Sequence, residues 1–185
     1  DSLGMVVAGD RNTLNVDMQQ IIYHLRYVKN GAPDIFTVAD MPFLSYKVSD
    51  EEAVKNSGEL IKNGADAVKI EGGTEVCKLI EKLVYADIPV MGHIGLTPQG
   101  ILKFGKYKKV GKKSREKEYL LESAKRMEEA GAFSIVLESM PEDIATEITE
   151  EINISTIGIG AGRYTDGQIL VWHDILGMYD KFKPS

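Results

Sequence analysis

The sequence predicts an α/β fold in which helices cover a parallel sheet. Short runs rich in β-branched residues alternate along the chain with longer segments whose apolar residues recur at helical spacing. This order is typical of successive βαβ units. The strand-like runs are almost continuously apolar, as expected where both faces of a sheet are covered. We therefore expect parallel strands with the helices outside them.

Six strands are predicted, each from a short apolar run bounded by turn residues. They cover residues 35–40, 67–71, 89–94, 133–138, 154–159 and 168–173. A closed (β/α)8 (TIM) barrel needs eight strands, so we expect this chain to supply about six, with two more before Asp1. A doubly wound open sheet is the alternative, but no G-x-G-x-x-G motif follows a strand at the start of a helix, as a dinucleotide site needs.

Helical periodicity predicts five helices between these strands. They cover residues 17–29, 49–63, 75–85, 116–130 and 142–151. Ser49 is a typical helix cap and the acids at 50–52 suit a first helical turn. No repeat or low-complexity tract interrupts the pattern, so we expect residues 1–185 to form a single α/β-barrel domain, incomplete at its amino terminus.

The composition disfavours several classes of protein. Hydrophobic residues make up 43% and charged residues 27%, which is ordinary for a soluble globular domain. A net charge of -6 disfavours nucleic acid as a partner, and no apolar run approaches the roughly 18 residues that span a membrane. The single cysteine, Cys77, fits a reducing compartment. With no signal-like stretch at the start, we expect a cytoplasmic protein.

Polar or ionisable residues stand at the carboxyl ends of four predicted strands. Asp40 ends the first strand, Lys69 and Glu71 the second, His93 the third and Glu138 the fourth. In a barrel these strand ends converge on one mouth, where active sites lie. Lys69 and Glu71 are two residues apart and leave the same face of the strand. Burying either one unpaired would be unfavourable, so the pattern implies mutual pairing or a bound ligand.

Asp1, Asp40 and Glu71 together offer hard oxygen ligands of the kind that suits Mg²⁺. The single cysteine and the scattered histidines argue against a structural zinc site. Each acid alone would more often be a surface residue or a helix cap. Their joint placement at predicted strand ends favours a metal site.

Six short segments stand out along the chain. They are DSLGM at 1–5, ADMPF at 39–43, VKIEGG at 68–73, GHIGLTPQ at 92–99, LESMP at 137–141, and GIGAG at 158–162 followed by TDGQ at 165–168. In this order and at this spacing they resemble the signature blocks of the ketopantoate hydroxymethyltransferase family, a member of the phosphoenolpyruvate-mutase-like barrels. The resemblance implies two further strands before the Asp-Ser motif and a longer carboxyl-terminal helical section, and we expect both to be missing from this chain.

The resemblance implies a magnesium site and a pocket for a 2-oxo acid. Asp1 and Asp40 would bind Mg²⁺ directly and, through the metal, would also bind the substrate. Glu71 would contact the metal through a water molecule. The metal would be chelated by the carboxylate and keto oxygens of the oxo acid and would act as a Lewis acid.

The resemblance also assigns the remaining polar residues. Ser2 and Lys69 would hold the oxo acid, with Lys69 on its carboxylate, and His93 would line the same pocket. Glu138 would be the general base that removes the weakly acidic C3 proton.

The reaction implied by the resemblance adds a hydroxymethyl group from 5,10-methylenetetrahydrofolate to 3-methyl-2-oxobutanoate. The product is 2-dehydropantoate (ketopantoate), and the step opens pantothenate and coenzyme A biosynthesis. Family members form homo-oligomers, so the resemblance implies one here.

Two other functions stay open from the sequence. One is another magnesium-dependent lyase or mutase of the same barrel group, although the lysine-rich loop lacks the cysteine that such enzymes typically use. The other is a non-catalytic subunit, because an incomplete barrel cannot close. The lysine-rich run at 103–117 is either a solvated loop or a positive lid that attracts the anionic tail of a folate-type carrier.

Overall fold

A six-stranded parallel sheet forms the centre of the protein, for which the computed structural model describes residues 1–105 and 109–178. The strands are β1 (Val38–Asp40), β2 (Ala67–Glu71), β3 (Val90–Gly95), β4 (Ser134–Glu138), β5 (Ser155–Ile159) and β6 (Gly167–Gln168). Each strand pairs in parallel with the next one along the chain. This order, with helical crossovers between strands, is that of an open part of a barrel and confirms the predicted fold class.

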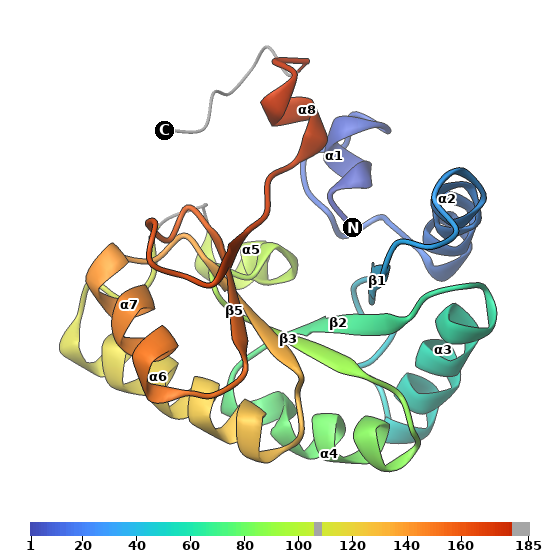
Figure 1. Cartoon of the computed structure of the whole chain (residues 1–185). Coiled ribbons are helices and arrows are strands. Elements are labelled where there is room, and N and C mark those ends of the chain that lie inside the picture. Colours follow the sequence, from blue (N-terminus) through green and yellow to red (C-terminus); the bar gives the residue numbers. More distant parts are fainter. Residues whose placement is uncertain (106–108, 179–185) are drawn as a thin grey trace.

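Helices follow the strands around the outside of the sheet. The longer ones are α2 (Met18–Gly31), α3 (Asp50–Lys62), α4 (Cys77–Tyr85), α6 (Ser114–Glu129) and α7 (Glu142–Glu151). The short ones are α1 (Leu3–Val6), η1 (Thr74–Val76), η2 (Pro98–Gly100), α5 (Ile101–Phe104) and α8 (Trp172–Ile175). Figure 1 shows α3, α4, α6 and α7 succeeding one another along one side of the sheet, and each contacts a strand. None of the helices in the described residues is long and apolar enough to cross a membrane.

Two helix starts show how local sequence fixes the elements. Asp17 caps α2 by accepting from the Gln20 backbone, and the Gln20 side chain accepts from the Asp17 backbone in return, which is a complete capping box. Ser49 caps α3 by accepting from the Glu52 backbone nitrogen at 3.1 Å. Both caps satisfy backbone donors that the first helical turn leaves unpaired.

The hydrophobic core lies between the outer face of the sheet and the helices. Val68, Ile70 and Leu137 point outward from β2 and β4 and are fully buried, together with Leu60 of α3 and Ile80 of α4. Burying an aliphatic side chain of this size stabilises the fold by about 1.5–3 kcal/mol. Because these residues take the outer face, their sequence neighbours must point to the opposite, inner face.

The predicted elements differ from the structure mainly at the ends of the sheet. The predicted strand at 35–40 begins only at Val38, and the predicted strand at 168–173 is wrong beyond Gln168. Ile169 and Leu170 are exposed, and no described strand pairs with the second edge of β6. The Ile169 nitrogen still donates to the Gly158 carbonyl oxygen at 3.0 Å, but burial does not extend the strand further and α8 begins at Trp172. The short elements η2 and α5 after β3 were not predicted, because they are too brief to show a period.

Candidate active site

The polar residues predicted at the strand ends share the inner face of the sheet. Asp40 of β1 pairs in register with Lys69 of β2, Glu71 pairs with His93 of β3, and Gly95 pairs with Glu138 of β4. Residues in register on neighbouring strands present their side chains on the same face. The polar residues of four successive strands, β1 to β4, thus lie on the same inner face of the sheet.

A continuous chain of polar contacts links these residues across the four strands. Lys69 Nζ lies 3.2 Å from Asp40 Oδ1 and 3.1 Å from His93 Nδ1. His93 Nε2 lies 3.1 Å from Glu138 Oε2 and 2.9 Å from the Leu96 carbonyl oxygen. This polar chain therefore runs from Asp40 through Lys69 and His93 to Glu138. The structure places these four residues together, as their positions at strand ends predicted.

The contacts of His93 define its tautomer. The Lys69 ammonium can only donate, so His93 Nδ1 must accept from it. The ring proton then sits on Nε2, which donates to the Leu96 carbonyl oxygen at 2.9 Å, and Glu138 Oε2 lies close by at 3.1 Å. His93 thus lies between the Lys69 ammonium on one side and the Glu138 carboxylate on the other.

Asp40 and Lys69 hold each other in their charged forms. Burial alone would raise the pKa of Asp40, but the charge of Lys69, whose Nζ lies 3.2 Å from Oδ1, acts against it and favours a pKa below the usual range. Burial alone would lower the pKa of Lys69, but Asp40 and then Glu71 raise it. The site therefore keeps a carboxylate and an ammonium side by side at neutral pH.

A second polar cluster adjoins Asp40 and contains the other two predicted metal ligands. The Asp1 nitrogen lies 2.9 Å from Asp40 Oδ2, and Asp1 Oδ2 accepts from Gln99 Nε2 at 2.9 Å. Glu71 is 1% exposed, and its Oε2 accepts from the Gln99 backbone nitrogen at 3.1 Å. Gln99 thus stands between Asp1 and Glu71.

One oxygen of Glu71 gives the clearest test of whether the site suits a cation. Glu71 Oε1 is buried and has no hydrogen-bond partner among the described residues. A buried acceptor in this state is unfavourable unless water or an ion satisfies it. Mg²⁺ usually takes one or two carboxylates and keeps several waters, so Asp1 and Asp40 as ligands, with Glu71 reached through water, fit the residues present. No group of three or more acidic, histidine or cysteine side chains in the described residues forms a ready-made metal cluster.

Ser2, predicted to hold the oxo acid, follows Asp1 at the start of α1. Its side chain is exposed and makes no capping hydrogen bond to that helix. Its hydroxyl is therefore available beside Asp1, and its predicted role stays a prediction.

Two buried polar residues of this region were not predicted as site residues. Tyr46 Oη accepts from the Glu71 backbone nitrogen at 3.1 Å and lies 2.9 Å from Gln99 Oε1. Gln99 belongs to a segment quoted above, but its contacts arise from η2, which the sequence pattern did not reveal. Burial raises the pKa of Tyr46, with a further contribution from the charge of Glu71, so the tyrosine remains a neutral hydrogen-bonding group.

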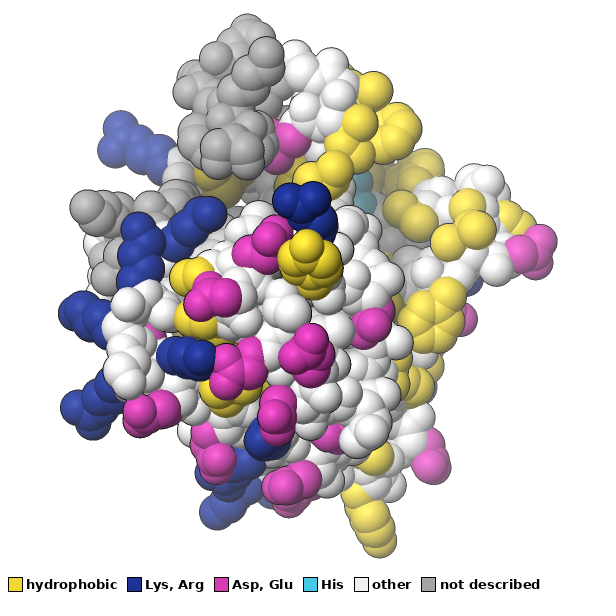
Figure 2. Space-filling model, turned by 60° about the vertical axis from the view of Figure 1, so that its left-hand side comes forward, with side chains coloured by type: hydrophobic (Ala, Val, Ile, Leu, Met, Phe, Trp, Pro, Cys, Tyr) yellow, Lys and Arg dark blue, Asp and Glu magenta, His cyan; other side chains and the backbone are white. Residues whose placement is uncertain are grey.

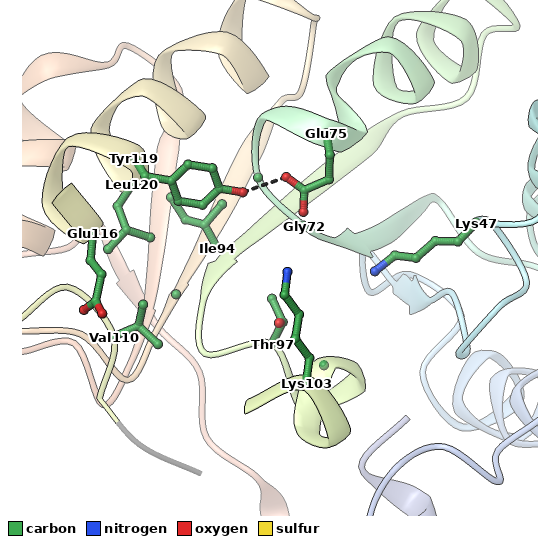
Figure 3. A pocket seen from close by; sticks show the side chains of 13 residues that line it. Lys47, Gly72, Glu75, Ile94, Thr97, Lys103, Val110, Glu116, Tyr119 and Leu120 are labelled. Carbon is green, nitrogen blue, oxygen red and sulfur yellow. Dashed lines mark hydrogen bonds between the residues drawn. The ribbon is translucent and has the colours of Figure 1, made fainter. Parts of the chain in front are cut away.

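A separate pocket of about 300 Å³ lies on the outer side of β3. Ile94 lines it, whereas the adjacent His93 faces the inner side. Figure 3 shows Lys47 and Lys103 pointing into the opening, opposite the hydrogen bond from Tyr119 to Glu75, which is 2.6 Å long. Burial and then that hydrogen bond raise the pKa of Tyr119 to about 12.

Only part of the lysine-rich run at 103–117 lies within the described residues. Lys106 and Lys108 lie outside the described residues, Lys103 faces the outer pocket, and Lys117 forms an ion pair with Glu147. Figure 2 shows acidic and basic side chains next to one another on the face that it presents, rather than a continuous basic surface. Whether the run acts as a lid stays a prediction.

The arrangement defines an α/β protein that supplies six parallel strands of a barrel, with polar residues at the carboxyl ends of the strands. Phosphoenolpyruvate phosphomutase from Streptomyces platensis shares this fold with a TM-score of 0.68, over 96% of this chain and 69% of that one, at 12% identity. A 2,3-dimethylmalate lyase of the PEP mutase/isocitrate lyase superfamily matches with a TM-score of 0.60, over 84% of this chain and 55% of that one, at 13% identity. These similarities concern the fold alone.

Sequence similarity is far more specific. The family model described as ketopantoate hydroxymethyltransferase matches residues 1–185. A 3-methyl-2-oxobutanoate hydroxymethyltransferase of Thermotoga maritima is 57% identical, and one of Thermosipho melanesiensis is 61% identical. Both matches cover 100% of this chain, and 68% and 70% of the respective relatives. The chain belongs to the ketopantoate hydroxymethyltransferase family and is an enzyme of that class, as the resemblance predicted.

Proposed function

We propose that the protein transfers a hydroxymethyl group to 3-methyl-2-oxobutanoate with Mg²⁺ bound and 5,10-methylenetetrahydrofolate as donor. The observation that carries the proposal is the polar chain from Asp40 to Glu138, which joins a proposed metal ligand to a candidate base along the carboxyl ends of four strands. Family membership supports the same activity.

The oxo acid would be bound at the end of the polar chain that contains Asp40. Asp1 and Asp40 would hold Mg²⁺, with Glu71 reaching it through water. When bound, the metal would supply Lewis-acid polarisation of the keto oxygen. The Lys69 ammonium, kept charged by Asp40, would pair with the carboxylate of the oxo acid, and the exposed Ser2 hydroxyl would add a hydrogen bond beside Asp1.

Glu138 would remove the C3 proton at the other end of the polar chain. Glu138 Oε2 lies 3.1 Å from His93 Nε2, within hydrogen-bond reach of the polar chain, as a candidate base requires. The deprotonated C3 would then bond to the methylene carbon of the folate, whose bonds to N5 and N10 both break. Water would provide the hydroxyl oxygen, and the C3 proton and one proton of that water would end on the two freed nitrogens. The products are ketopantoate and tetrahydrofolate.

Three broader properties belong to the same proposal. The product would enter pantothenate and coenzyme A biosynthesis at its first step, and the protein would act as a homo-oligomer. Both follow from the family resemblance. A cytoplasmic location is supported by the single free cysteine, Cys77, which is buried. We further propose that residues 1–185 fold as one α/β-barrel domain.

Hydroxymethyl transfer by the purified protein and by Glu138→Gln tests the proposal. Removing a general base costs about 10²- to 10⁴-fold in rate, so turnover should fall by at least about 100-fold. Glu150→Gln, which alters an exposed carboxylate of α7, is the control and should keep its turnover within about twofold. Near-normal turnover of Glu138→Gln would remove Glu138 from the role of base, and absence of transfer in the unaltered protein would contradict the function itself.

A further inference from the structure

Gln99 is an uncharged residue that is buried between two of the proposed metal-binding acids, Asp1 and Glu71. It is 5% exposed, and every polar atom of its side chain is used. Nε2 donates to Asp1 Oδ2 at 2.9 Å and to the Met41 carbonyl oxygen at 2.8 Å. Its backbone nitrogen donates to Glu71 Oε2 at 3.1 Å. A single residue thus holds the carboxylates of Asp1 and Glu71, which come from distant parts of the chain.

The hydrogen bonds leave Gln99 one possible orientation. Asp1 and the Met41 carbonyl can only accept, so the amide nitrogen must face them. The amide oxygen then faces Tyr46 Oη at 2.9 Å, and that hydroxyl accepts from the Glu71 backbone nitrogen at 3.1 Å. Reversing the amide would set its oxygen against two acceptors, so the network fixes the side chain.

Gln99 contacts one oxygen of each of the two carboxylates. Gln99 Nε2 contacts Oδ2 of Asp1, and the Gln99 backbone contacts Oε2 of Glu71. Glu71 Oε1 keeps no partner among the described residues and is buried. Gln99 therefore orients two acids while sparing the oxygen of Glu71 that a metal-bound water would meet. Groups that orient metal ligands from outside the coordination sphere are commonly worth 10- to 100-fold in metal affinity.

We infer that Gln99 is the positioning residue of the magnesium site, fixing Asp1 and Glu71 before the cation arrives. The inference rests on the proposed function, because it takes these acids as the residues that hold the metal. Gln99 itself touches neither the substrate nor the reacting atoms in this role. It acts through the two carboxylates.

Magnesium binding without substrates, followed by titration calorimetry, tests the inference. Gln99→Met keeps a similar volume but removes the amide, and Gln99→Asn keeps an amide that is one methylene too short to reach Asp1. Mg²⁺ affinity should fall by about 10- to 100-fold in both variants. Asn56→Leu is the matched control: it removes a half-buried side-chain amide that donates to the Ser45 carbonyl at 2.7 Å but contacts none of the proposed ligands. Its affinity for Mg²⁺ should stay that of the unaltered protein.

The outcomes separate this inference from the proposed function. If both Gln99 variants bind Mg²⁺ as tightly as the unaltered protein, the positioning role is wrong while the magnesium-dependent function stands. If Asn56→Leu loses affinity to the same extent, the effect is one of general packing and the inference is again overturned. If the unaltered protein binds no Mg²⁺, the metal part of the proposed function fails first. Gln99→Asn decides the question should Gln99→Met not fold.

Discussion

His93 links the cationic and the carboxylate ends of the polar chain through its two ring nitrogens, so two substitutions can separate their roles. The asparagine amide reaches the place of Nδ1 and can keep the contact to Lys69, whereas the glutamine amide reaches the place of Nε2 and can keep the contact to Glu138. Each lost polar contact should cost about 1–1.5 kcal/mol, or about tenfold.

His93→Gln should therefore raise the KM for the oxo acid by about tenfold, and His93→Asn should mainly lower kcat by a similar factor. Steady-state kinetics with varied 3-methyl-2-oxobutanoate measure both parameters. Equal changes in KM and kcat for the two variants would show that the two nitrogens of His93 do not serve separate ends of the site.

Site residues on strands were easier to predict than those on loops. The alternation of a strand fixes the face of each residue, so Lys69, His93 and Glu138 could be assigned to one mouth from sequence alone. Gln99 and Tyr46 reach the same site from loops, whose paths depend on tertiary contacts that no periodicity encodes. The direct partner of Asp1 and Glu71 could not be foreseen for that reason.

At the scale of elements, the junction between β3 and β4 is held together by a close approach at Gly95. Gly95 has a φ of +99°, and a Cβ atom there would lie 2.2 Å from the Glu138 carbonyl oxygen. The same oxygen accepts from the Leu96 nitrogen at 2.9 Å. A side chain at position 95 would therefore push the end of β3 away from the proposed base.

Gly95→Ala should destabilise the protein by about 3 kcal/mol or more, since backbone strain of 1–3 kcal/mol adds to a clash with a carbonyl oxygen. Gly9→Ala is the matched control, because Gly9 has a φ of +77° and nothing within 4 Å of the added carbon. It should cost only about 1 kcal/mol. Urea unfolding of both variants checks the difference, and equal midpoints would contradict the role given to the close approach.

Element prediction succeeded where a segment was both buried and bounded by clear signals. β2 and α7 have the predicted bounds, and α3 begins after the predicted cap Ser49. The strand predicted at 168–173 failed because apolar residues alone do not make a strand. Ile169 and Leu170 have no described neighbour along the open edge of β6 and remain exposed.

At the scale of the whole molecule, a bound cation should stabilise the fold because it binds only where the strand ends are assembled. Saturation at about 100 times the Kd adds about 2.7 kcal/mol, which corresponds to about 5–10 °C in Tm for a chain of this length. As one proposed domain, the protein should also melt in a single transition.

Scanning calorimetry with Mg²⁺ and with EDTA checks both expectations. Asp40→Asn should abolish most of the shift in Tm, because it removes a proposed ligand. An undiminished shift in that variant would place the cation elsewhere, and two separate transitions would contradict the single domain.

Exchange of the C3 hydrogen of 3-methyl-2-oxobutanoate in deuterium oxide, followed by proton NMR without any folate, isolates the step in which the metal and the base cooperate. The C3 signal should disappear when the protein and Mg²⁺ are both present. It should persist when EDTA is added or when Glu138→Gln replaces the unaltered protein. A persistent C3 signal in the unaltered protein, with Mg²⁺ and the oxo acid both shown to bind, would contradict the proposed chemistry.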